Sequence, residues 1–190
     1  MQKGRRRNKE SNEDRLRPKP SEILPWLYLG TKYHFLDSVM LRELGITRVL
    51  SVVGGRIPEE YPPEKYAISP MSDYGTDKLA TKLPPLLEFI AQAKQANEKI
   101  LVHCQLGANR SPTVVLAYLV KHEEMTLKEA VRHVKKRRPL VHPVDRYLLQ
   151  LRALEKEWTG RCTLSEEDQE HFFPSLSRRC QAPPTPLEED

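Results

Sequence analysis

The segment from His103 to Ser111, with the sequence HCQLGANRS, constrains the fold more than any other part of the chain. An apolar run over 99–102 precedes it and an apolar stretch over 113–120 follows it, which predicts a short strand, a tight loop and a buried helix. In such a loop the backbone N–H groups curl inward and the helix adds its positive end, so the loop can hold a dianion. A thiol at its base, here Cys104, would ionise near neutral pH because the surrounding dipoles favour the thiolate.

The rest of the middle of the chain alternates between strand and helix patterns. Expected helices cover 35–44, 83–95, 111–122, 126 onward and 144–158, and expected strands cover 46–53, 65–68 and 99–104. Pro84 and Pro85 fit the first turn of their helix, and Thr126 with Glu129 has the spacing of a capping box. This order predicts a single α/β domain with a central, mostly parallel, twisted sheet and helices on both faces. The 103–111 loop would then lie at the carboxyl end of a strand, where open α/β sheets bind ligands.

The two ends of the chain differ in composition from the middle, so we expect the folded domain to cover 21–158. Residues 1–20 are basic and nearly devoid of apolar side chains, which predicts a disordered tail. Residues 159–190 combine acidic runs with prolines, which predicts a loosely ordered C-terminal tail. Phe172 and Phe173 are the exception, since they could pack back on the domain.

The formal net charge of +5 suits a phosphorylated, acidic partner. Two basic clusters, Arg5–Arg7 and Lys135–Arg138, could dock such a partner. Simpler readings are a solvated tail for the first cluster and, for the second, cations that complement the dipole of a helix C-terminus. The sequence gives no indication of an oligomeric state.

Cysteine usage and hydropathy indicate an intracellular protein. The three cysteines are odd in number and irregularly spaced, which favours free thiols in a reducing compartment. The chain has no run of about 18 apolar residues and no apolar core of a secretory signal near its first residue. We therefore expect a cytoplasmic or nuclear protein without a membrane span.

The pattern HC-x5-RS resembles the phosphate loop of the cysteine-dependent protein tyrosine phosphatase superfamily, and HCQLGANRSPT is similar to the small, atypical dual-specificity protein phosphatases. Trp26–Gly30 resembles the first strand of that family, and Leu44–Val52 resembles its entry from helix to strand. Arg138 with Pro139, followed by Tyr147–Leu151, resembles the turn into its last helix. The resemblance covers about residues 21–158 and implies a phosphatase-like fold.

The resemblance assigns roles to the loop residues. Cys104 would attack phosphorus and form a thiophosphate intermediate. Arg110 would clamp two phosphoryl oxygens with its planar fork. Ser111 could hydrogen-bond the thiolate and ease its departure, while His103 would shape the loop without transferring a proton. The residues expected to hold the substrate phosphate are Gln105, Leu106, Gly107, Ala108, Asn109 and Arg110.

A protein of this family also needs a carboxylic acid that protonates the leaving oxygen. In the resembled family it lies about thirty residues before the cysteine, just after a strand. Asp73 lies 31 positions before Cys104, directly at the exit of the expected 65–68 strand, and is the favoured candidate. Asp77, at 27 positions, is the alternative, although its position better fits a loop aspartate that caps the next helix.

Two departures from the family pattern bear on turnover. The family usually has Asn where this chain has Val144, and that Asn braces the phosphate loop, so the loop is either less rigid here or braced by another group. Asn109 stands where Ser is common.

These features predict an enzyme that hydrolyses phosphotyrosine and phosphoserine or phosphothreonine in proteins, with neither metal nor cofactor. The absence of Lys and Arg between Cys104 and Arg110 argues against polyphosphoinositides. The enzymatic alternative is an RNA 5′-triphosphatase of the same superfamily, although Ser111-Pro112 fits protein phosphatases better and a nucleic-acid partner is not expected. A weakly active phosphoprotein-binding module is the other alternative.

Overall fold

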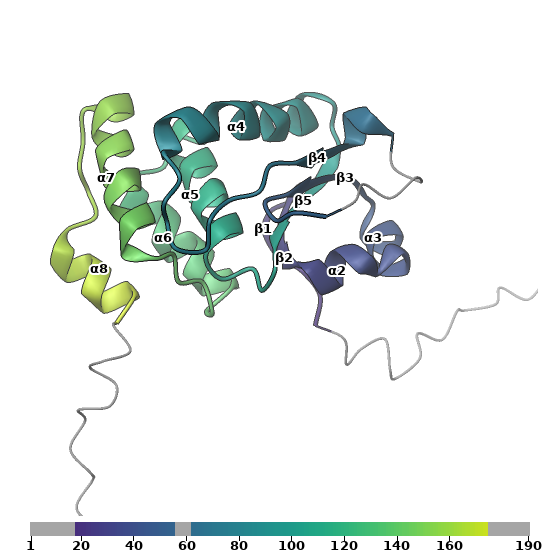
Figure 1. The fold of residues 1–190 in the computed structure, drawn as a ribbon, viewed down its shortest axis with the longest axis horizontal. Coiled ribbons are helices and arrows are strands. Elements are labelled where there is room, and N and C mark those ends of the chain that lie inside the picture. Colours follow the sequence, from purple (N-terminus) through teal and green to yellow (C-terminus); the bar gives the residue numbers. More distant parts are fainter. Residues whose placement is uncertain (1–17, 56–61, 175–190) are drawn as a thin grey trace, which may run out of the picture.

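A five-stranded sheet forms the centre of the protein in a computed structural model, which describes residues 18–55 and 62–174 (Figure 1). The spatial order of the strands is β1-β2-β5-β3-β4. Their bounds are Ser21–Leu24 for β1, Leu27–Thr31 for β2, Ile46–Ser51 for β3, Tyr66–Ile68 for β4 and Lys99–Cys104 for β5. Only β1 runs antiparallel to its neighbour among these strands. The prediction of a central, mostly parallel sheet is confirmed.

Strand β5 is the middle strand of the sheet, and it pairs in parallel with β2 on one side and β3 on the other. Parallel sheets have helices on both faces, so a strand in this position needs apolar side chains on both of its faces. Ile100, Leu101 and Val102 are fully buried, as the apolar run predicts. The predicted bounds of 99–104 match those of β5, and the strand delivers Cys104 to the carboxyl edge of the sheet.

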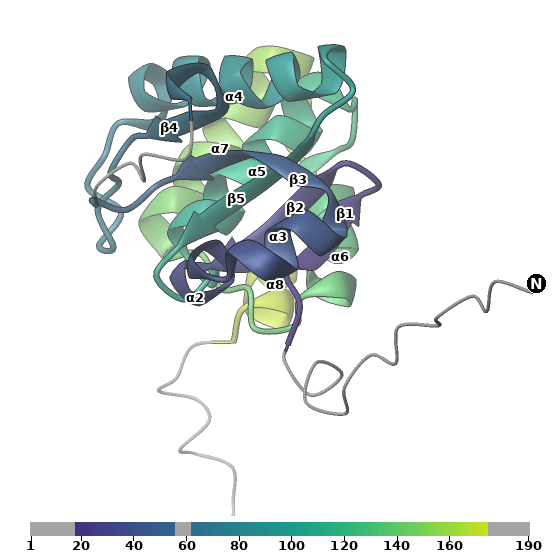
Figure 2. The same cartoon turned by 90° about the vertical axis from the view of Figure 1, so that its right-hand side faces the viewer.

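Helices cover both faces of the sheet (Figure 2). One face carries α2, Lys32–Leu36, and α3, Ser38–Leu44. The other face carries α4 (Leu79–Gln95), α5 (Arg110–His122), α6 (Leu127–Arg137) and α7 (Asp145–Thr159). Helix α5 lies in the middle of this layer, and every residue from Ser111 to Val120 is buried. The N-terminus of α5 is thereby fixed against the end of β5.

Two helices differ from their predicted bounds. The expected helix 35–44 is split into α2 and α3 at Asp37, whose carboxylate accepts a hydrogen bond from the Met40 N–H and caps α3. Helix α4 begins at Leu79 instead of 83, so Pro84 and Pro85 lie in its second turn. Burial of Leu79 and Leu83 offsets the backbone hydrogen bonds that the two prolines cannot donate.

The folded part continues beyond residue 158, contrary to the expected domain end. Helix α8, Glu166–Phe172, follows α7, and its N-cap Ser165 forms a capping box with Asp168. Leu164 and Phe173 are both buried in the main core, so they hold this segment on the domain. The possibility that Phe173 packs back is confirmed. Residues 1–17 and 175–190, with the Arg5–Arg7 cluster, lie outside the described residues. Within the described ranges, no helix is long and apolar enough to cross a membrane.

Candidate active site

The loop 105–109 between β5 and α5 is held in place by hydrogen bonds that its backbone carbonyl groups accept from other segments. Arg138 donates from Nε to the Gly107 carbonyl at 2.8 Å and from Nη2 to the Leu106 carbonyl at 2.9 Å. The N–H groups of Lys32 and His142 donate to the carbonyls of Gln105 and Ala108. Because these carbonyls are bound by other segments of the chain, the backbone N–H groups of the loop can face an anion bound at its centre.

Gly107 cannot be replaced by a larger residue without moving the loop. Its φ angle is +66°, a region that residues with a Cβ rarely adopt. A Cβ atom there would lie 2.4 Å from the Gly30 carbonyl oxygen and 2.7 Å from Arg138 Nη2. The glycine therefore lets the loop approach both the end of β2 and the guanidinium that supports it.

Cys104 lies at the base of this loop with only 2% of its surface exposed. Its Sγ atom accepts hydrogen bonds from the Gly107 N–H and the Ser111 hydroxyl, each at 3.2 Å. Burial is the largest single influence on the thiol and opposes ionisation, but the hydroxyl and N–H of Ser111, the N–H of Gly107 and the charge of Arg110 together outweigh it. The pKa of Cys104 is consequently lowered, which favours a thiolate nucleophile.

His103 is buried and is absent from the lining of the pocket that contains Cys104. Its Nδ1 atom lies 3.2 Å from the Cys104 carbonyl, which can only accept, so the ring carries its proton there. The ring stacks on Phe35 with 5.0 Å between centroids. Burial, helped by the nearby His34 and Lys32 and opposed by the bond to Cys104, lowers the pKa of His103 to about 4. The imidazole is neutral near pH 7 and orients the end of β5.

Asp73 and Arg110 meet at the rim of the site. Oδ1 of Asp73 lies 3.0 Å from Arg110 Nε, in an ion pair whose N–H is not aligned for a hydrogen bond. The Asp73 side chain is 59% exposed, so it reaches the pocket from a loop at the surface. Together with the loop these residues line a pocket of about 130 Å³, formed by Asp73, Cys104, Gln105, Leu106, Ala108, Asn109 and Arg110.

Asp77 lies outside the pocket that contains Cys104. Its Oδ2 atom accepts hydrogen bonds from the Ser72 N–H at 2.6 Å and from the Tyr147 hydroxyl at 2.5 Å. The Tyr147 hydroxyl also lies 2.6 Å from the Ser72 carbonyl. Asp77 thus closes the loop before α4, and it is absent from the lining of the pocket that contains Cys104.

Two residues have structural roles at the site that the sequence did not predict. Arg138 belongs to the cluster Lys135–Arg138, yet it is buried at 7% exposure beneath the loop instead of facing a partner. Asn109 was expected to bind phosphate, which stays a prediction, and its side chain is hydrogen-bonded to Asp73 and Val144. Only the position of Arg138 just before Pro139, at the helix end that the family resemblance covers, hinted at its role.

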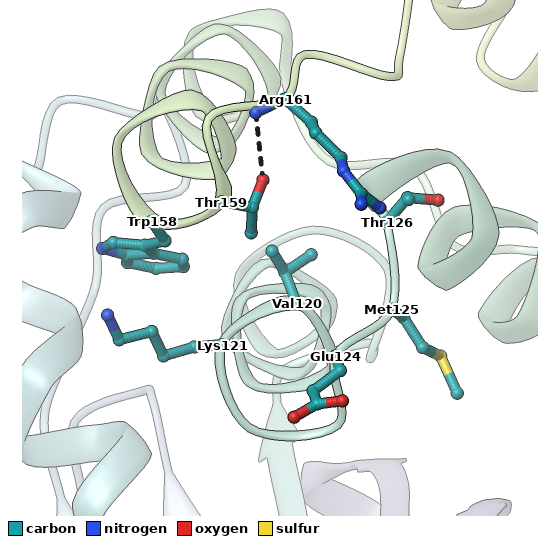
Figure 3. A pocket seen from close by; sticks show the side chains of 8 residues that line it. All are labelled: Val120, Lys121, Glu124, Met125, Thr126, Trp158, Thr159 and Arg161. Atoms are coloured by element: carbon teal, nitrogen blue, oxygen red, sulfur yellow. Dashed lines mark hydrogen bonds between the residues drawn. The ribbon is translucent and has the colours of Figure 1, made fainter.

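A second pocket, of about 400 Å³, lies at the opposite end of α5 (Figure 3). On one side of it the Lys121 Nζ atom lies over the Trp158 ring, 5.0 Å from the ring centroid. The adjoining N-terminus of α6 has its N–H groups bound by Thr126, Glu129, Glu155 and Thr163. Although this pocket is larger, no thiol lines it, so the chemistry points to the site around Cys104.

Comparisons with known proteins agree with this geometry. The family model "Dual specificity phosphatase, catalytic domain" matches residues 27–157. Dual specificity protein phosphatase 5 of Rattus norvegicus is 37% identical over 139 residues, which cover 73% of this chain and 36% of that protein. Dual specificity protein phosphatase 4 of Rattus norvegicus is 36% identical over 171 residues, covering 88% of this chain and 42% of that protein. The chain therefore spans less than half the length of these two relatives.

A solved structure supports the same assignment. The crystal structure of human DUSP28 superposes with a TM-score of 0.68 and 26% sequence identity, covering 74% of this chain and 98% of that one. The family match includes β5, the loop with Cys104 and Arg110, and the helices that support them. The chain belongs to the family of dual specificity phosphatase catalytic domains.

Proposed function

We propose that this protein hydrolyses phosphotyrosine and phosphoserine or phosphothreonine in protein substrates. The observation that carries the proposal is the environment of Cys104, whose buried Sγ accepts two hydrogen bonds at the base of a pocket with Arg110 at its rim. A thiol with a lowered pKa that accepts hydrogen bonds from the Gly107 N–H and the Ser111 hydroxyl suits nucleophilic attack on a bound phosphate dianion.

In the first step, the Cys104 thiolate attacks phosphorus while the bond from phosphorus to the leaving oxygen breaks. Asp73 gives its proton to that oxygen, and Arg110 binds the phosphoryl oxygens during transfer. In the second step, Asp73 takes a proton from water, which attacks the thiophosphate. The Ser111 hydroxyl, 3.2 Å from Sγ, stabilises the thiolate as it leaves. The reaction releases the free hydroxyl and then inorganic phosphate.

The pocket favours substrates with a single phosphate. Arg110 is the only cation among the residues that line it, so a headgroup or RNA end with several phosphates would lack further partners there. The volume of about 130 Å³ accommodates a phosphate with little of the attached side chain, which suits serine and threonine as well as tyrosine. We place the protein in a reducing compartment, cytoplasm or nucleus, since the mechanism needs a free thiolate.

Only part of the cluster Lys135–Arg138 could dock a partner. Arg138 is buried, and Lys135 lies over the Phe173 ring at 4.9 Å while donating to the Val141 carbonyl. Lys136 and Arg137 remain exposed and could attract an acidic substrate. The N-terminal cluster Arg5–Arg7 stays a second proposed docking arm.

The test is an assay of the full chain beside Cys104→Ser on phosphotyrosine peptides, phosphothreonine peptides and triphosphate-ended RNA, under reducing conditions. We expect phosphate release from both peptides, loss of at least about a thousandfold in the variant, and no release from RNA. Release from RNA alone would instead establish the triphosphatase. Peptide binding without turnover by the unsubstituted chain would establish a binding module.

A further inference from the structure

Asn109 is the residue directly before α5, and its backbone is firmly placed. Its carbonyl accepts hydrogen bonds from the Thr113 N–H at 3.1 Å and from Thr113 Oγ1 at 2.9 Å. Although Asn109 is the N-cap of α5, its side chain makes no capping hydrogen bond to that helix. The carboxamide is therefore available for contacts outside its own helix.

The carboxamide of Asn109 makes three hydrogen bonds, all to other segments. Nδ2 donates to the Asp73 carbonyl oxygen at 2.8 Å and to the Asp73 carboxylate at 3.0 Å. Oδ1 accepts from the Val144 N–H at 3.0 Å. The partners fix which end of the amide is which, because a carbonyl can only accept and a backbone N–H can only donate.

Asn109 thus joins the phosphate loop, the loop that carries Asp73 and the start of α7. The second and third of these segments are also in direct contact at Gly75. A Cβ atom on Gly75 would lie 2.8 Å from both Val144 Cγ2 and Arg146 Cβ, so the chain packs there without room for a side chain. Val144 supplies an apolar surface for Gly75, while its N–H is satisfied by Asn109.

The contact of Asn109 with Asp73 matters most when substrate is bound. In the structure Asp73 is held by Arg110 and by Asn109. A substrate phosphate would engage the Arg110 guanidinium and weaken its pairing with Asp73. The hydrogen bond from Asn109 to the Asp73 backbone carbonyl is independent of that charge and would persist.

We propose that Asn109 is a positioning residue that holds Asp73 over the leaving oxygen during the first chemical step. The proposal rests on the function proposed above for Asp73. It also identifies a brace for the phosphate loop in a chain with Val144, whose side chain has no polar group. A serine at 109 could not replace it, because one short hydroxyl cannot serve both the Asp73 carbonyl and the Val144 N–H.

The test compares Asn109→Ala, Asp73→Asn and the double variant on aryl phosphates whose leaving groups have pKa values from about 5 to about 10. For Asn109→Ala we expect a kcat/KM loss of about tenfold on the poorest leaving group and less than about twofold on the best, because kcat/KM reports the first chemical step. Asp73→Asn should show the same trend with a larger loss, of about a hundredfold. The double variant should depend on the leaving group no more steeply than Asp73→Asn, since a misplaced acid and an absent acid are equivalent.

Gln92→Ala removes an exposed amide from α4 and serves as the matched control, with unchanged kinetics expected. Thermal unfolding of each variant separates loss of fold from loss of function. A kcat/KM loss for Asn109→Ala that is equal on all leaving groups, or a leaving-group dependence that is steeper in the double variant than in Asp73→Asn, would overturn the positioning role. If the loss caused by Asp73→Asn is itself the same on all leaving groups, Asp73 is not the acid. The same data therefore separate failure of the positioning role from failure of the proposed acid.

Discussion

At the scale of single residues, the site depends on several weak donors acting against burial. Cys104 is almost fully buried, which by itself would keep the thiol protonated. The donors from Gly107 and Ser111, with Arg110 nearby, reverse that preference. Each donor is modest, so the state of the sulfur should respond to the loss of any one of them.

Ser111→Ala removes the hydroxyl that donates to Cys104 Sγ. Since this bond lowers the thiol pKa, its loss raises the pKa and shifts the ascending limb of kcat/KM to higher pH. The rate of alkylation by iodoacetamide as a function of pH reports the thiolate directly. Alkylation and kinetic profiles that coincide with those of the unsubstituted protein would contradict this role for Ser111.

His103 should make stability depend on pH. Its pKa is lowered from 6.5 to about 4 in the folded protein, so between these values the unfolded chain binds more protons. The free energy of unfolding should therefore fall as the pH falls from about 6.5 to about 4, with a contribution from His103 of up to about 3 kcal/mol.

Urea titrations of the unsubstituted protein and His103→Gln over this pH range measure that contribution. His34 and His122 also have lowered pKa values, mainly through burial, so both proteins retain part of the dependence. The expected result is a shallower dependence in the variant. Parallel curves would show that His103 is not the source.

At the scale of elements, the phosphate loop is held by hydrogen bonds from Arg138, the residue at the C-terminal end of α6. Arg138 leaves that helix and donates to two carbonyls of the loop with its Nε and Nη2 atoms. The charge also lies near Cys104, whose thiolate form raises the pKa of Arg138 against the dominant lowering by burial. Both the fork and the charge of Arg138 therefore support the loop.

Arg138→Lys keeps the charge but cannot donate to both carbonyls at once. We expect vanadate binding to weaken by about tenfold, corresponding to the loss of one charge-assisted hydrogen bond. Isothermal titration measures the Kd, and Arg137→Lys, at the exposed neighbouring position, is the matched control. Equal Kd values for the two variants would show that the loop does not need this fork.

The element pattern shows which features sequence alone can predict. The strand 99–104, the helix after the loop and the capping box of Thr126 with Glu129 were all predicted, because each depends on local periodicity or local hydrogen bonds. The inward turn of Arg138 and the bridge made by Asn109 depend on segments 31 to 36 positions away. No local pattern encodes such contacts, so the site's support was found only in three dimensions.

The predicted bounds of two helices were wrong where a local sequence signal is compatible with more than one structure. Pro84 and Pro85 indicated a helix start, yet burial of Leu79 extends α4 one turn earlier. Asp37 lies within an apolar periodic stretch but caps α3 and interrupts it. In both cases packing or a side-chain cap outweighed the periodic pattern.

At the scale of the whole molecule, the C-terminal segment through α8 is part of the domain. Glu155 of α7 is fully buried and accepts hydrogen bonds from the Leu127 N–H and from the N–H and hydroxyl of Thr163. This carboxylate ties the start of α6 to the chain that leads into α8. Phe173 then packs edge-on against His142, whose N–H supports the phosphate loop.

A chain that stops at Gly160 loses the buried side chains of Leu164 and Phe173. We expect its free energy of unfolding to be lower by about 3–6 kcal/mol than that of a chain that stops at Pro174. Urea titration followed by circular dichroism measures the difference. Equal midpoints and slopes for the two chains would contradict a structural role for α8.

The proposed mechanism requires that Cys104 becomes covalently phosphorylated during turnover. The most direct measurement is rapid acid quench with a phosphotyrosine peptide labelled with radioactive phosphate, followed by proteolysis and mass spectrometry of the labelled fragment. We expect label on Cys104 in the unsubstituted protein and none in Cys104→Ser. Label on another residue would contradict it.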